Sequence, residues 1–523
     1  MSAEALLAEL RDPACYPHAP AAVQLVQTHL SVVCLAGDLV YKLKKARRLP
    51  FVDFSTLAAR RATCRDEVRL NRRLCADVYL GTAALRRDAG GALRFAAIGD
   101  DDGPDDLDTA VVMRRLPADR MLDRLVHERR ATTAEIERLA RHLAAFHAGA
   151  DRGPAVLAAG DPLRLQGFAA ANFRELAAVP DHGLPAALLQ RVAAASAEDF
   201  ARLLPLLQRR AAAGRVVDGH GDLHARNVCL VEPPVVYDCI EFEPAFRCGD
   251  VATENAFLVM DLRHRHAPDL AAVWTAAYVA ASGDTEQPAL LPPLVAYRAM
   301  VRAKVAALAA AEPELPADDR AAARRSAHRH LWLAAAASLE ARGPRWLVVC
   351  GPPASGKSSL CTALVDVAHW PHFATDVVRK QLAGLPPAAT AGGEHYTAAA
   401  SQRTYDELLR RAAAATAAGA PVVLLDGNFP TAALRAAAAA AARAAGARLQ
   451  VAFVAVDAAT AAARAARRTA DPDRVSDADA AVTARLHAAF APPTAGEGLA
   501  LVQLDGAQPT EALAAHLLGA LLA

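Results

Sequence analysis

The pattern of apolar and polar positions changes near residue 342, and this change predicts two domains. Before it, short strand-like segments lie between about residues 20 and 117, and long amphipathic helical stretches follow. After it, apolar runs of strand length alternate with helical patterns, which predicts a parallel sheet covered on both faces. Arg-Gly-Pro at 342–344 separates the two patterns. We therefore predict an α/β multidomain chain with domains at residues 1–341 and 345–523.

The first domain is predicted to have two lobes. The small lobe spans about residues 20–117, is rich in strands, and contains one helix-like run from Ser55 to Cys75. The large lobe spans about residues 118–341 and is helical. A β-rich lobe followed by a helical lobe is the order of a bilobal, protein-kinase-like α+β fold.

Composition adds a chemical signal, because lysine is scarce. Only six of the 58 Lys and Arg residues are Lys, as expected of a GC-rich coding sequence that exchanges Lys for Arg wherever Arg serves. An ammonium kept against this drift indicates a need for a compact point charge, and phosphate binding is a common reason. Five of the six lie in the segments VYKLKK, GPPASGKSS and DVVRK.

Charge and hydropathy narrow the class of protein. The formal net charge of +1 does not favour a nucleic-acid or anionic-membrane partner. No run of 18 strongly apolar residues occurs, and the first residues have neither the basic nor the apolar part of a signal peptide. The nine Cys form no CxxC pair, which argues against a disulfide framework or a zinc motif. We expect a soluble, cytoplasmic protein, and nothing in the sequence indicates its oligomeric state.

Residues 218–227 read DGHGDLHARN, and Asp238 ends the apolar run VVYD eleven residues after Asn227. A kinase needs a carboxylate near the attacking hydroxyl and oxygen ligands that hold Mg²⁺ on the nucleotide phosphates. We assign Asp222 as the catalytic carboxylate, and Asn227 and Asp238 as metal ligands. For Glu241 two roles stay open: an additional metal or substrate ligand, or an ion-pair partner of Arg247.

This constellation resembles the aminoglycoside-phosphotransferase-like kinases, whose loop HGDxHxxN is followed by an Asp that binds magnesium. The resemblance covers roughly residues 20–310. It implies a small-lobe Lys for the α- and β-phosphates, for which Lys42 fits and Lys44, on the same face of the strand, is the rival. It also implies that Glu67 orients this Lys. No GxGxxG precedes VYK, so Ser31 and nearby backbone N–H groups are expected to cover the phosphates.

Residues 351–359 read GPPASGKSS, which satisfies GxxxxGK[ST] between an apolar strand and a helix-like run. The two glycines allow a tight backbone whose N–H groups surround phosphate oxygens. Lys357 is expected to neutralise the β- and γ-phosphates and Ser358 to bind Mg²⁺. The predicted nucleotide contacts are Gly351, Pro352, Pro353, Ala354, Ser355, Gly356, Lys357, Ser358 and Ser359.

Three further residues complete the predicted second site. Asp376 is expected at the end of the second strand as a substrate-facing catalytic carboxylate, with a helix cap as the alternative. Asp426 is expected at the end of the third strand as a metal-binding, Walker-B-type acid. An Arg-rich stretch then resembles the lid of nucleoside-, gluconate- and zeta-toxin-like kinases, in which we assign Arg468 first. A solvated Arg-rich helix face is the alternative.

The whole chain resembles bacterial fusions of an aminoglycoside-phosphotransferase-like kinase domain with a P-loop (AAA-type, zeta-toxin-like) small-molecule kinase domain. The resemblance implies an ATP-dependent phosphotransferase with two active sites, ATP and Mg²⁺ as cofactors, and hydroxyls of small molecules as acceptors. One rival is a regulatory ATP-binding protein in which one half senses nucleotide or acts on a protein partner. Another is an antibiotic-modifying phosphotransferase, although no obvious acidic cluster would hold a polycationic aminoglycoside.

Overall fold

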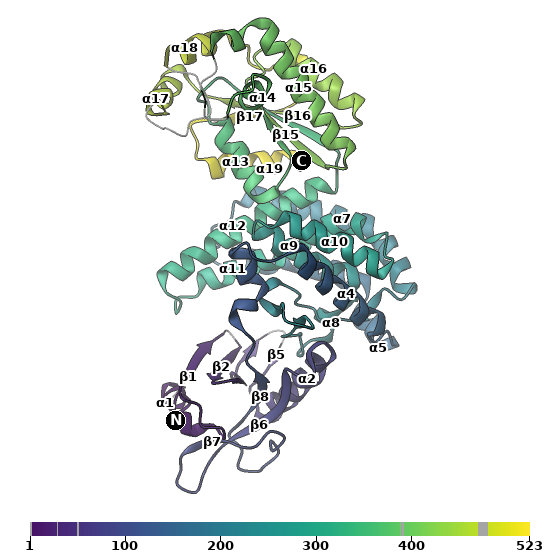
Figure 1. Cartoon of the computed structure of the whole chain (residues 1–523), viewed down its shortest axis with the longest axis vertical. Helices are drawn as coiled ribbons and strands as arrows, with labels where there is room; N and C mark the ends of the chain where they lie inside the picture. The colour runs from purple at the N-terminus through teal and green to yellow at the C-terminus, as the bar shows by residue number, and fades with distance from the viewer. Residues whose placement is uncertain (1–2, 29, 50–51, 387–388, 390–391, 469–479) are drawn as a thin grey trace. The chain divides into compact units, whose positions relative to one another are not determined.

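The computed structural model describes residues 3–28, 30–49, 52–386, 389, 392–468 and 480–523 (Figure 1). Its contacts divide the chain into two compact units. The first contains Met1–Gly167 and Leu203–Leu291, and the second contains Phe168–Arg202 and Pro292–Ala523. The mixed α/β fold class is confirmed. The domain boundary that we place near residues 342–344 is not tested by this division and stays a prediction.

The small lobe of the first unit is a six-stranded sheet in the order β1-β2-β3-β8-β6-β7. Its strands are β1 (Val23–Gln27), β2 (Ser31–Ala36), β3 (Leu39–Lys44), β6 (Tyr79–Arg87), β7 (Leu93–Phe95) and β8 (Asp108–Arg114). Helix α2 (Leu57–Cys75) packs on β6 and β8. The short strands and the single long helix that the sequence predicts for this lobe are present.

Strand β3 explains why the two candidate lysines share a face. Side chains alternate along a strand, and Tyr41 and Leu43 enter the core on one face of the sheet. Val40 belongs instead to the core formed with α2. Lys42 and Lys44 follow Val40 at every second position along β3, so their side chains lie on the same face of the sheet as Val40. This is the face that α2 covers.

The rest of the first unit holds the predicted catalytic loop among helices. The loop runs from β9 (Val216–Asp218), which pairs with β12 (Cys248–Asp250), to the 3₁₀ turn Ala225–Asn227. The paired strands β10 (Val228–Cys229) and β11 (Val235–Val236) follow, as the sequence predicted. The helices are α1 (Ala3–Glu9), α3 (Leu122–His127), α4 (Thr133–Gly149), α5 (Pro154–Ala159), α8 (Pro244–Arg247), α9 (Val251–His264) and α10 (Pro268–Ser282). Helix α10 packs against α4 and α9.

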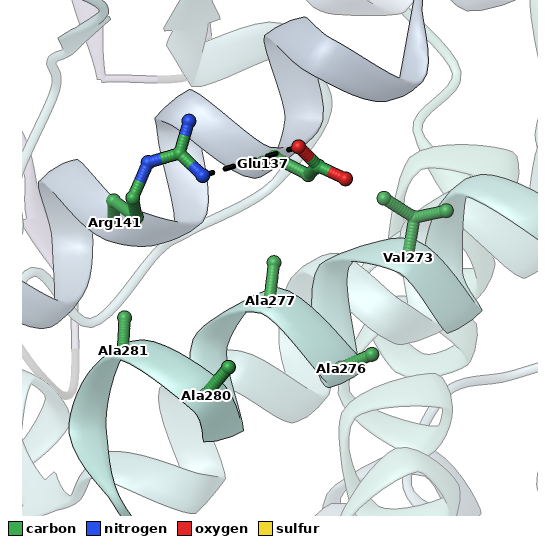
Figure 2. A pocket seen from close by; sticks show the side chains of 7 residues that line it. All are labelled: Glu137, Arg141, Val273, Ala276, Ala277, Ala280 and Ala281. Atoms are coloured by element: carbon green, nitrogen blue, oxygen red, sulfur yellow. Dashed lines mark ion pairs between the residues drawn. The ribbon is translucent and has the colours of Figure 1, made fainter.

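A hollow of about 470 Å³ lies between α4 and α10 (Figure 2). Figure 2 shows Val273 and Ala277 of α10 pointing toward the ion pair of Glu137 and Arg141 on α4, whose closest atoms are 3.9 Å apart. Its remaining lining is three alanines of α10. None of the predicted site residues lines this hollow.

The second unit is built on a parallel five-stranded sheet in the order β14-β15-β13-β16-β17. Its strands are β13 (Arg345–Cys350), β14 (His372–Ala374), β15 (Val422–Asp426), β16 (Arg448–Ala455) and β17 (Ala500–Asp505). The first strand, β13, lies in the middle, so the chain proceeds to both sides of it. Ligands of open α/β sheets bind at the carboxyl ends of strands beside such a switch point.

The helices of the second unit lie before, between and after the strands, and those that come after β13 match the alternating pattern predicted from the sequence. They are α12 (Ala317–Glu340), α13 (Lys357–Ala368), α14 (Thr375–Leu382), α15 (Ala398–Ala417), α16 (Ala432–Ala444), α17 (Ala458–Arg468), α18 (Ala480–Ala488) and α19 (Thr510–Leu521). Three other helices run through the points where the contacts divide the chain: α6 (Pro162–Ala177), α7 (Ala186–Ala212) and α11 (Gln287–Ala311). No helix within the described residues has the length and apolar character that a membrane span requires.

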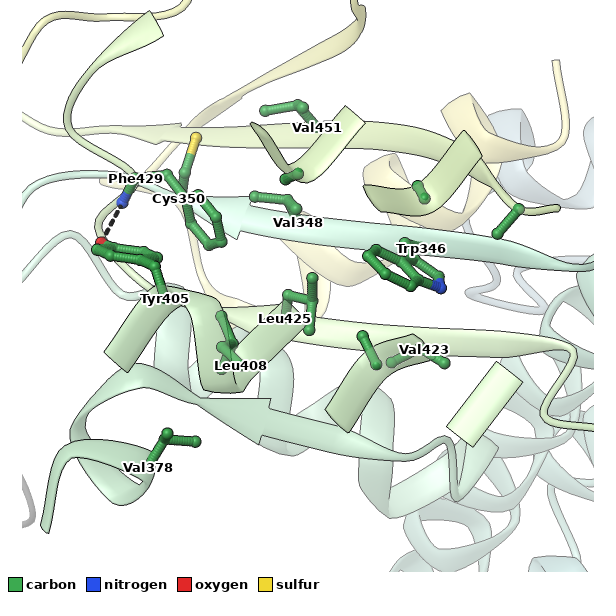
Figure 3. Packing of buried hydrophobic residues seen from close by; sticks show 14 of the residues in the cluster. Trp346, Val348, Cys350, Val378, Tyr405, Leu408, Val423, Leu425, Phe429 and Val451 are labelled. Carbon is green, nitrogen blue, oxygen red and sulfur yellow. Dashed lines mark hydrogen bonds between the residues drawn. The ribbon is translucent and has the colours of Figure 1, made fainter. Parts of the chain in front are cut away.

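Strand β13 supplies the centre of the core of the second unit. Figure 3 shows Trp346, Val348 and Cys350, at alternate positions, beside Val423 and Leu425 of β15. Every residue of β13 is buried, as expected of a parallel strand with both faces covered. The indole nitrogen of Trp346 donates a hydrogen bond of 2.8 Å to Thr416, so its one polar atom is satisfied.

Candidate active sites

The first candidate site contains a row of alternating charges that is buried at Glu67, Lys44 and Glu241 and open to solvent at Asp238. Lys42 Nζ lies 2.9 Å from Glu67 and also contacts the carboxylate of Asp238. Lys44 Nζ contacts the second oxygen of Glu67 and the carboxylate of Glu241. Glu67 therefore lies between two ammonium groups, each of which is paired in turn with an acid of the segment that follows β11.

Burial and charge oppose each other at Glu67, and charge prevails. Burial alone would raise the pKa of this carboxyl, but the ammonium groups of Lys42 and Lys44 lower it below its ordinary value. Burial likewise works against the charge of Lys44, yet Glu67 and Glu241 raise the pKa of that ammonium. Burial raises the pKa of Glu241. We regard Lys44 and Glu241 as an ionised pair, because Lys44 is buried and its charge needs both Glu67 and Glu241 as counter-charges.

These contacts bear on two questions that the sequence left open. Both lysines reach Glu67, but Lys42 alone contacts Asp238, which favours Lys42 as the phosphate ligand and gives Lys44 a supporting place. The ion pair considered between Glu241 and Arg247 was wrong, since Arg247 Nε lies 2.8 Å from Asp218. Asp218 neighbours the start of the loop and attracts this guanidinium away from Glu241.

The catalytic loop brings Asp222 and Asn227 together. The amide nitrogen of Asn227 donates to the backbone oxygen of Asp222 at 3.0 Å and to its carboxylate at 3.2 Å. His224 Nε2 lies 3.3 Å from the same carboxylate, which is about one third exposed. Asp222 is therefore oriented by its neighbours and still open to a substrate. Ser31 is only 2% exposed, so the geometry does not support its predicted role over the phosphates.

His220 links the two predicted metal-binding segments. Its Nδ1 accepts the N–H of Asp222 at 3.3 Å, and its Nε2 lies 2.8 Å from the backbone oxygen of Tyr237. Nε2 must therefore carry the proton, which fixes a neutral tautomer. Burial lowers the pKa of His220 and favours this neutral form. The ring thus holds Asp222 at a set position relative to Asp238, the residue after Tyr237.

Glu254, in the first turn of α9, holds the catalytic loop in place through its carboxylate. It is not among the residues predicted from the sequence. Its carboxylate accepts the N–H of His220 at 2.8 Å and lies 3.3 Å from Nε2 of the buried His147. No motif marks Glu254, which follows Asp250 by four residues. Asp250 itself pairs with Arg210 and caps α9, in keeping with a structural role.

Loss of the Glu254 carboxylate should make the stability of the first unit less sensitive to low pH. Burial would raise the pKa of Glu254, but His147 and the loop N–H groups outweigh it and lower the pKa from 4.5 to about 2. This carboxylate therefore contributes fully above about pH 4.5, on the order of 3 kcal/mol, and its contribution is lost as the pH falls toward about 2. We expect Glu254→Gln to be less stable at neutral pH and to lose less stability in acid, measured by unfolding in denaturant. Parallel pH profiles of the two proteins would contradict this role.

Removal of Lys44 should destabilise the first unit strongly. Lys44→Ala leaves two buried carboxylates short of a counter-charge, and breaking a buried ion pair from one side costs about 3–5 kcal/mol. Lys45→Ala is the matched control, because the ammonium of this neighbouring residue is bonded to the backbone oxygen of Thr28 near the surface. Its effect should stay within about 0.5 kcal/mol. Equal unfolding free energies for the two variants would show that the Lys44 network contributes nothing.

The second candidate site is the loop of residues 351–359 between β13 and α13, hereafter the P-loop. Gly356, at the N-terminus of α13, has a φ of 101°, where a residue with a Cβ is strained. A Cβ on Gly351 would lie 2.6 Å from the backbone oxygen of Val454, so this position has no room for a side chain. Lys357 is the first residue of α13, and the exposed Ser358 follows it. The loop therefore has the backbone and helix terminus that an anion needs.

Arg464 of α17 braces the P-loop from outside. Its guanidinium donates to the backbone oxygen of Ser355 at 3.2 Å and to that of Gly506 at 2.8 Å. The Arg-rich stretch was expected to act as a lid, with Arg468 as first choice. Arg468 is the last residue of α17, but its side chain lies outside what the structure describes. The lid assignment stays a prediction, and Arg464 has a supporting contact that the sequence did not reveal.

Asp376 does not end the second strand, contrary to our expectation. Strand β14 lies at the edge of the sheet, pairs only with β15, and ends at Ala374 opposite Asp426. Asp376 lies in the first turn of α14, and its carboxylate is 2.9 Å from Arg379. The structure shows no side-chain cap at this helix, which does not favour the capping alternative. Asp426 ends β15 as predicted, beside β13.

The model of the AAA domain family matches residues 347–493, which contain the P-loop, Asp376 and Asp426. This match agrees with the P-loop domain that the sequence predicts in the second part of the chain.

The curated relatives identify the family. The uncharacterized protein Rv2004c of Mycobacterium tuberculosis and the uncharacterized protein Mb2027c of Mycobacterium bovis are each 32% identical to the chain over 363 residues. The match covers 69% of this chain and 68% of each relative. The chain belongs to the family of these mycobacterial proteins. A match of this length must include the middle of the chain and so crosses the predicted domain boundary.

Two solved structures are similar to parts of the chain. A choline/ethanolamine kinase family protein from Mesorhizobium loti is 15% identical, with 63% of this chain and 94% of that chain covered and a TM-score of 0.38. A gluconokinase from Sinorhizobium meliloti is 20% identical, with 34% of this chain and 91% of that chain covered and a TM-score of 0.25. At these scores we draw no argument about function from either.

Proposed function

We propose that the chain is an ATP-dependent phosphotransferase with two active sites, each transferring the γ-phosphoryl group to a hydroxyl of a small molecule. The observation that carries the proposal is the contact of Lys42 with both Glu67 and Asp238, beside the loop that holds Asp222 and Asn227. These contacts support the proposal, because the groups expected to bind phosphate, hold a metal and accept a proton lie near one another.

The donor groups of the first site fit Mg²⁺. This cation takes oxygen ligands and keeps several waters, and Asp238 and Asn227 offer a carboxylate and an amide oxygen. Asp238 is 42% exposed, so it is open to solvent on one side. Bound Mg²⁺ would neutralise charge on the transferring phosphate. Asn227 already uses its amide nitrogen on Asp222, which leaves its oxygen for a ligand.

The other residues of the first site have separate proposed roles in proton transfer and phosphate binding. Asp222 accepts the proton of the acceptor hydroxyl as the bond to phosphorus forms. Lys42 moves from Asp238 to the nucleotide phosphates, while Glu67 stays in place because Lys44, which is itself held by Glu241, still contacts it. A retained second lysine is thus explained, since Glu67 would otherwise lose its buried counter-charge whenever Lys42 binds phosphate.

In the second site, the P-loop N–H groups and Lys357 are proposed to bind the phosphates, and Ser358 and Asp426 to hold Mg²⁺. Asp376 faces the acceptor and accepts its proton, and the ion pair with Arg379 orients this carboxylate. Small molecules are the proposed acceptors in both sites, with neither nucleic acid nor membrane as a partner.

Variants of the two sites should separate the two activities. Wild type, Asp222→Asn and Lys357→Ala are screened for ADP release against a panel of small hydroxyl compounds. Asp222→Asn should lose roughly 10²–10⁴-fold turnover for acceptors of the first site, because a positioned base contributes that much. Lys357→Ala should lose only the other acceptors. Turnover that survives in both variants would contradict the proposal, and nucleotide binding without turnover in wild type would favour the sensor alternative.

Asp376→Asn tests the base of the second site. The amide keeps a hydrogen bond to Arg379 but cannot accept a proton, so phosphoryl transfer should fall strongly while ATP affinity and the melting temperature stay nearly unchanged. Gln402→Ala, on the exposed surface of α15, serves as the control. If transfer survives in Asp376→Asn, the residue is structural and Asp426 becomes the candidate.

A further inference from the structure

Three potential metal ligands from three elements converge in the second unit. They are Cys361 of α13, His372 of β14 and Asp426 at the end of β15. One ligand atom of each residue lies within 4.8 Å of the other two. His372 Nε2 and a carboxylate oxygen of Asp426 are 3.8 Å apart. No motif in the sequence marks this cluster, because its members are separated by 11 and 54 positions.

Two residues of the cluster are buried, and the third, His372, has a side chain that is 26% exposed but a ring nitrogen that is enclosed. Cys361 is fully buried and Asp426 is 4% exposed. His372 Nε2 is enclosed, and it has no hydrogen-bond partner among the described residues. An enclosed polar atom without a partner is costly, and in native proteins such an atom commonly has a water, an ion or a catalytic role. A ligand bound between His372 Nε2, the carboxylate of Asp426 and the thiol of Cys361 would supply the missing partner.

We propose that Cys361, His372 and Asp426 form a binding site for a divalent transition-metal cation of the Zn²⁺ type. Thiolate sulfur, imidazole nitrogen and carboxylate oxygen are the three ligand types that zinc takes in proteins. In a tetrahedral site two N or O ligands at roughly 2.0–2.1 Å from the metal lie about 3.3–3.4 Å apart. The 3.8 Å between His372 and Asp426 needs only a small adjustment. Mg²⁺ does not suit sulfur and nitrogen donors.

Binding balances in charge and protons. The cation takes the carboxylate of Asp426 and the neutral imidazole of His372, and Cys361 loses its thiol proton to solvent as the sulfur binds. The fourth position is left to a water molecule. The bound cation replaces the missing hydrogen-bond partner of His372 and the counter-charge that the buried carboxylate requires.

Such a site would control the second kinase reaction, and this consequence rests on the proposed function. Asp426 is the acid that we assign to Mg²⁺, and it cannot serve both cations in the same geometry. A zinc-type cation held by Cys361 and His372 would withdraw it from the nucleotide site. The second activity should therefore be inhibited by Zn²⁺, whereas the binding itself does not depend on that activity.

The binding test uses the full chain, first freed of metal, and Co²⁺ as the spectroscopic probe. Wild type should give a thiolate-to-cobalt charge-transfer band and the intense visible bands of tetrahedral Co²⁺, with a stoichiometry of one, and Zn²⁺ should abolish both. Cys361→Ala should lose the charge-transfer band. Cys350→Ala is the matched control, because Cys350 is an equally buried thiol of the neighbouring strand β13 outside the cluster. No charge-transfer band in wild type, or an undiminished one in Cys361→Ala, would overturn the proposal.

His372→Gln provides a second variant should Cys361→Ala fail to fold, which its melting temperature reveals. It should weaken Co²⁺ binding at least tenfold and keep the charge-transfer band at saturating metal. Unchanged affinity in a folded His372→Gln would overturn the assignment of His372.

Inhibition is then measured on an acceptor of the second site at fixed ATP and Mg²⁺. Zn²⁺ should inhibit wild type and Cys350→Ala, whereas Cys361→Ala and His372→Gln should keep their turnover and resist inhibition. Equal inhibition of all four proteins would overturn the regulatory consequence. If wild type lacks turnover, the proposed function of the second site fails, while the cobalt bands still decide whether the metal site exists.

Discussion

The first unit depends on one buried carboxylate. Glu67 is fully enclosed between β3 and α2, where an unpaired charge would not be tolerated, and two ammonium groups from alternate positions of one strand neutralise it. Those lysines in turn hold Asp238 and Glu241, so the segment after β11 is bound to the sheet through Glu67. The small lobe and the predicted metal-binding segment are therefore positioned by the same row of charges.

This arrangement gives a physical reason why some positions keep lysine in a chain that otherwise uses arginine. A guanidinium is planar and needs room for its fork, whereas an ammonium can donate to two carboxylates from a single point. Lys42 and Lys44 each contact two acids in a buried space, and Lys357 begins a helix at a loop too tight for a side chain at Gly351. In the first unit the row of charges positions the site. In the second unit this is done by the backbone of the P-loop, to which Arg464 donates a hydrogen bond.

Much of this could be predicted from the sequence, because it depends on local patterns. Period-two alternation placed Lys42 and Lys44 on one face, and the spacing of HGDLHARN placed Asn227 beside Asp222. What failed depends on contacts between distant segments. Asp376 was assigned to a strand because the apolar run HFA continues toward it, but an edge strand ends where its one neighbour stops pairing. Glu254, Arg464 and the partner of Glu241 follow from tertiary packing, which no motif encodes.

The central claim is that the chain has two separate ATP sites, and nucleotide stoichiometry tests it most directly. Titration calorimetry with a non-hydrolysable ATP analogue and Mg²⁺ should give about two sites per chain. Lys357→Ala should retain only the site of the first unit and Lys42→Ala only that of the second, with both variants folded by circular dichroism. A single site in the intact wild type, or loss of both sites in either variant, would contradict the account.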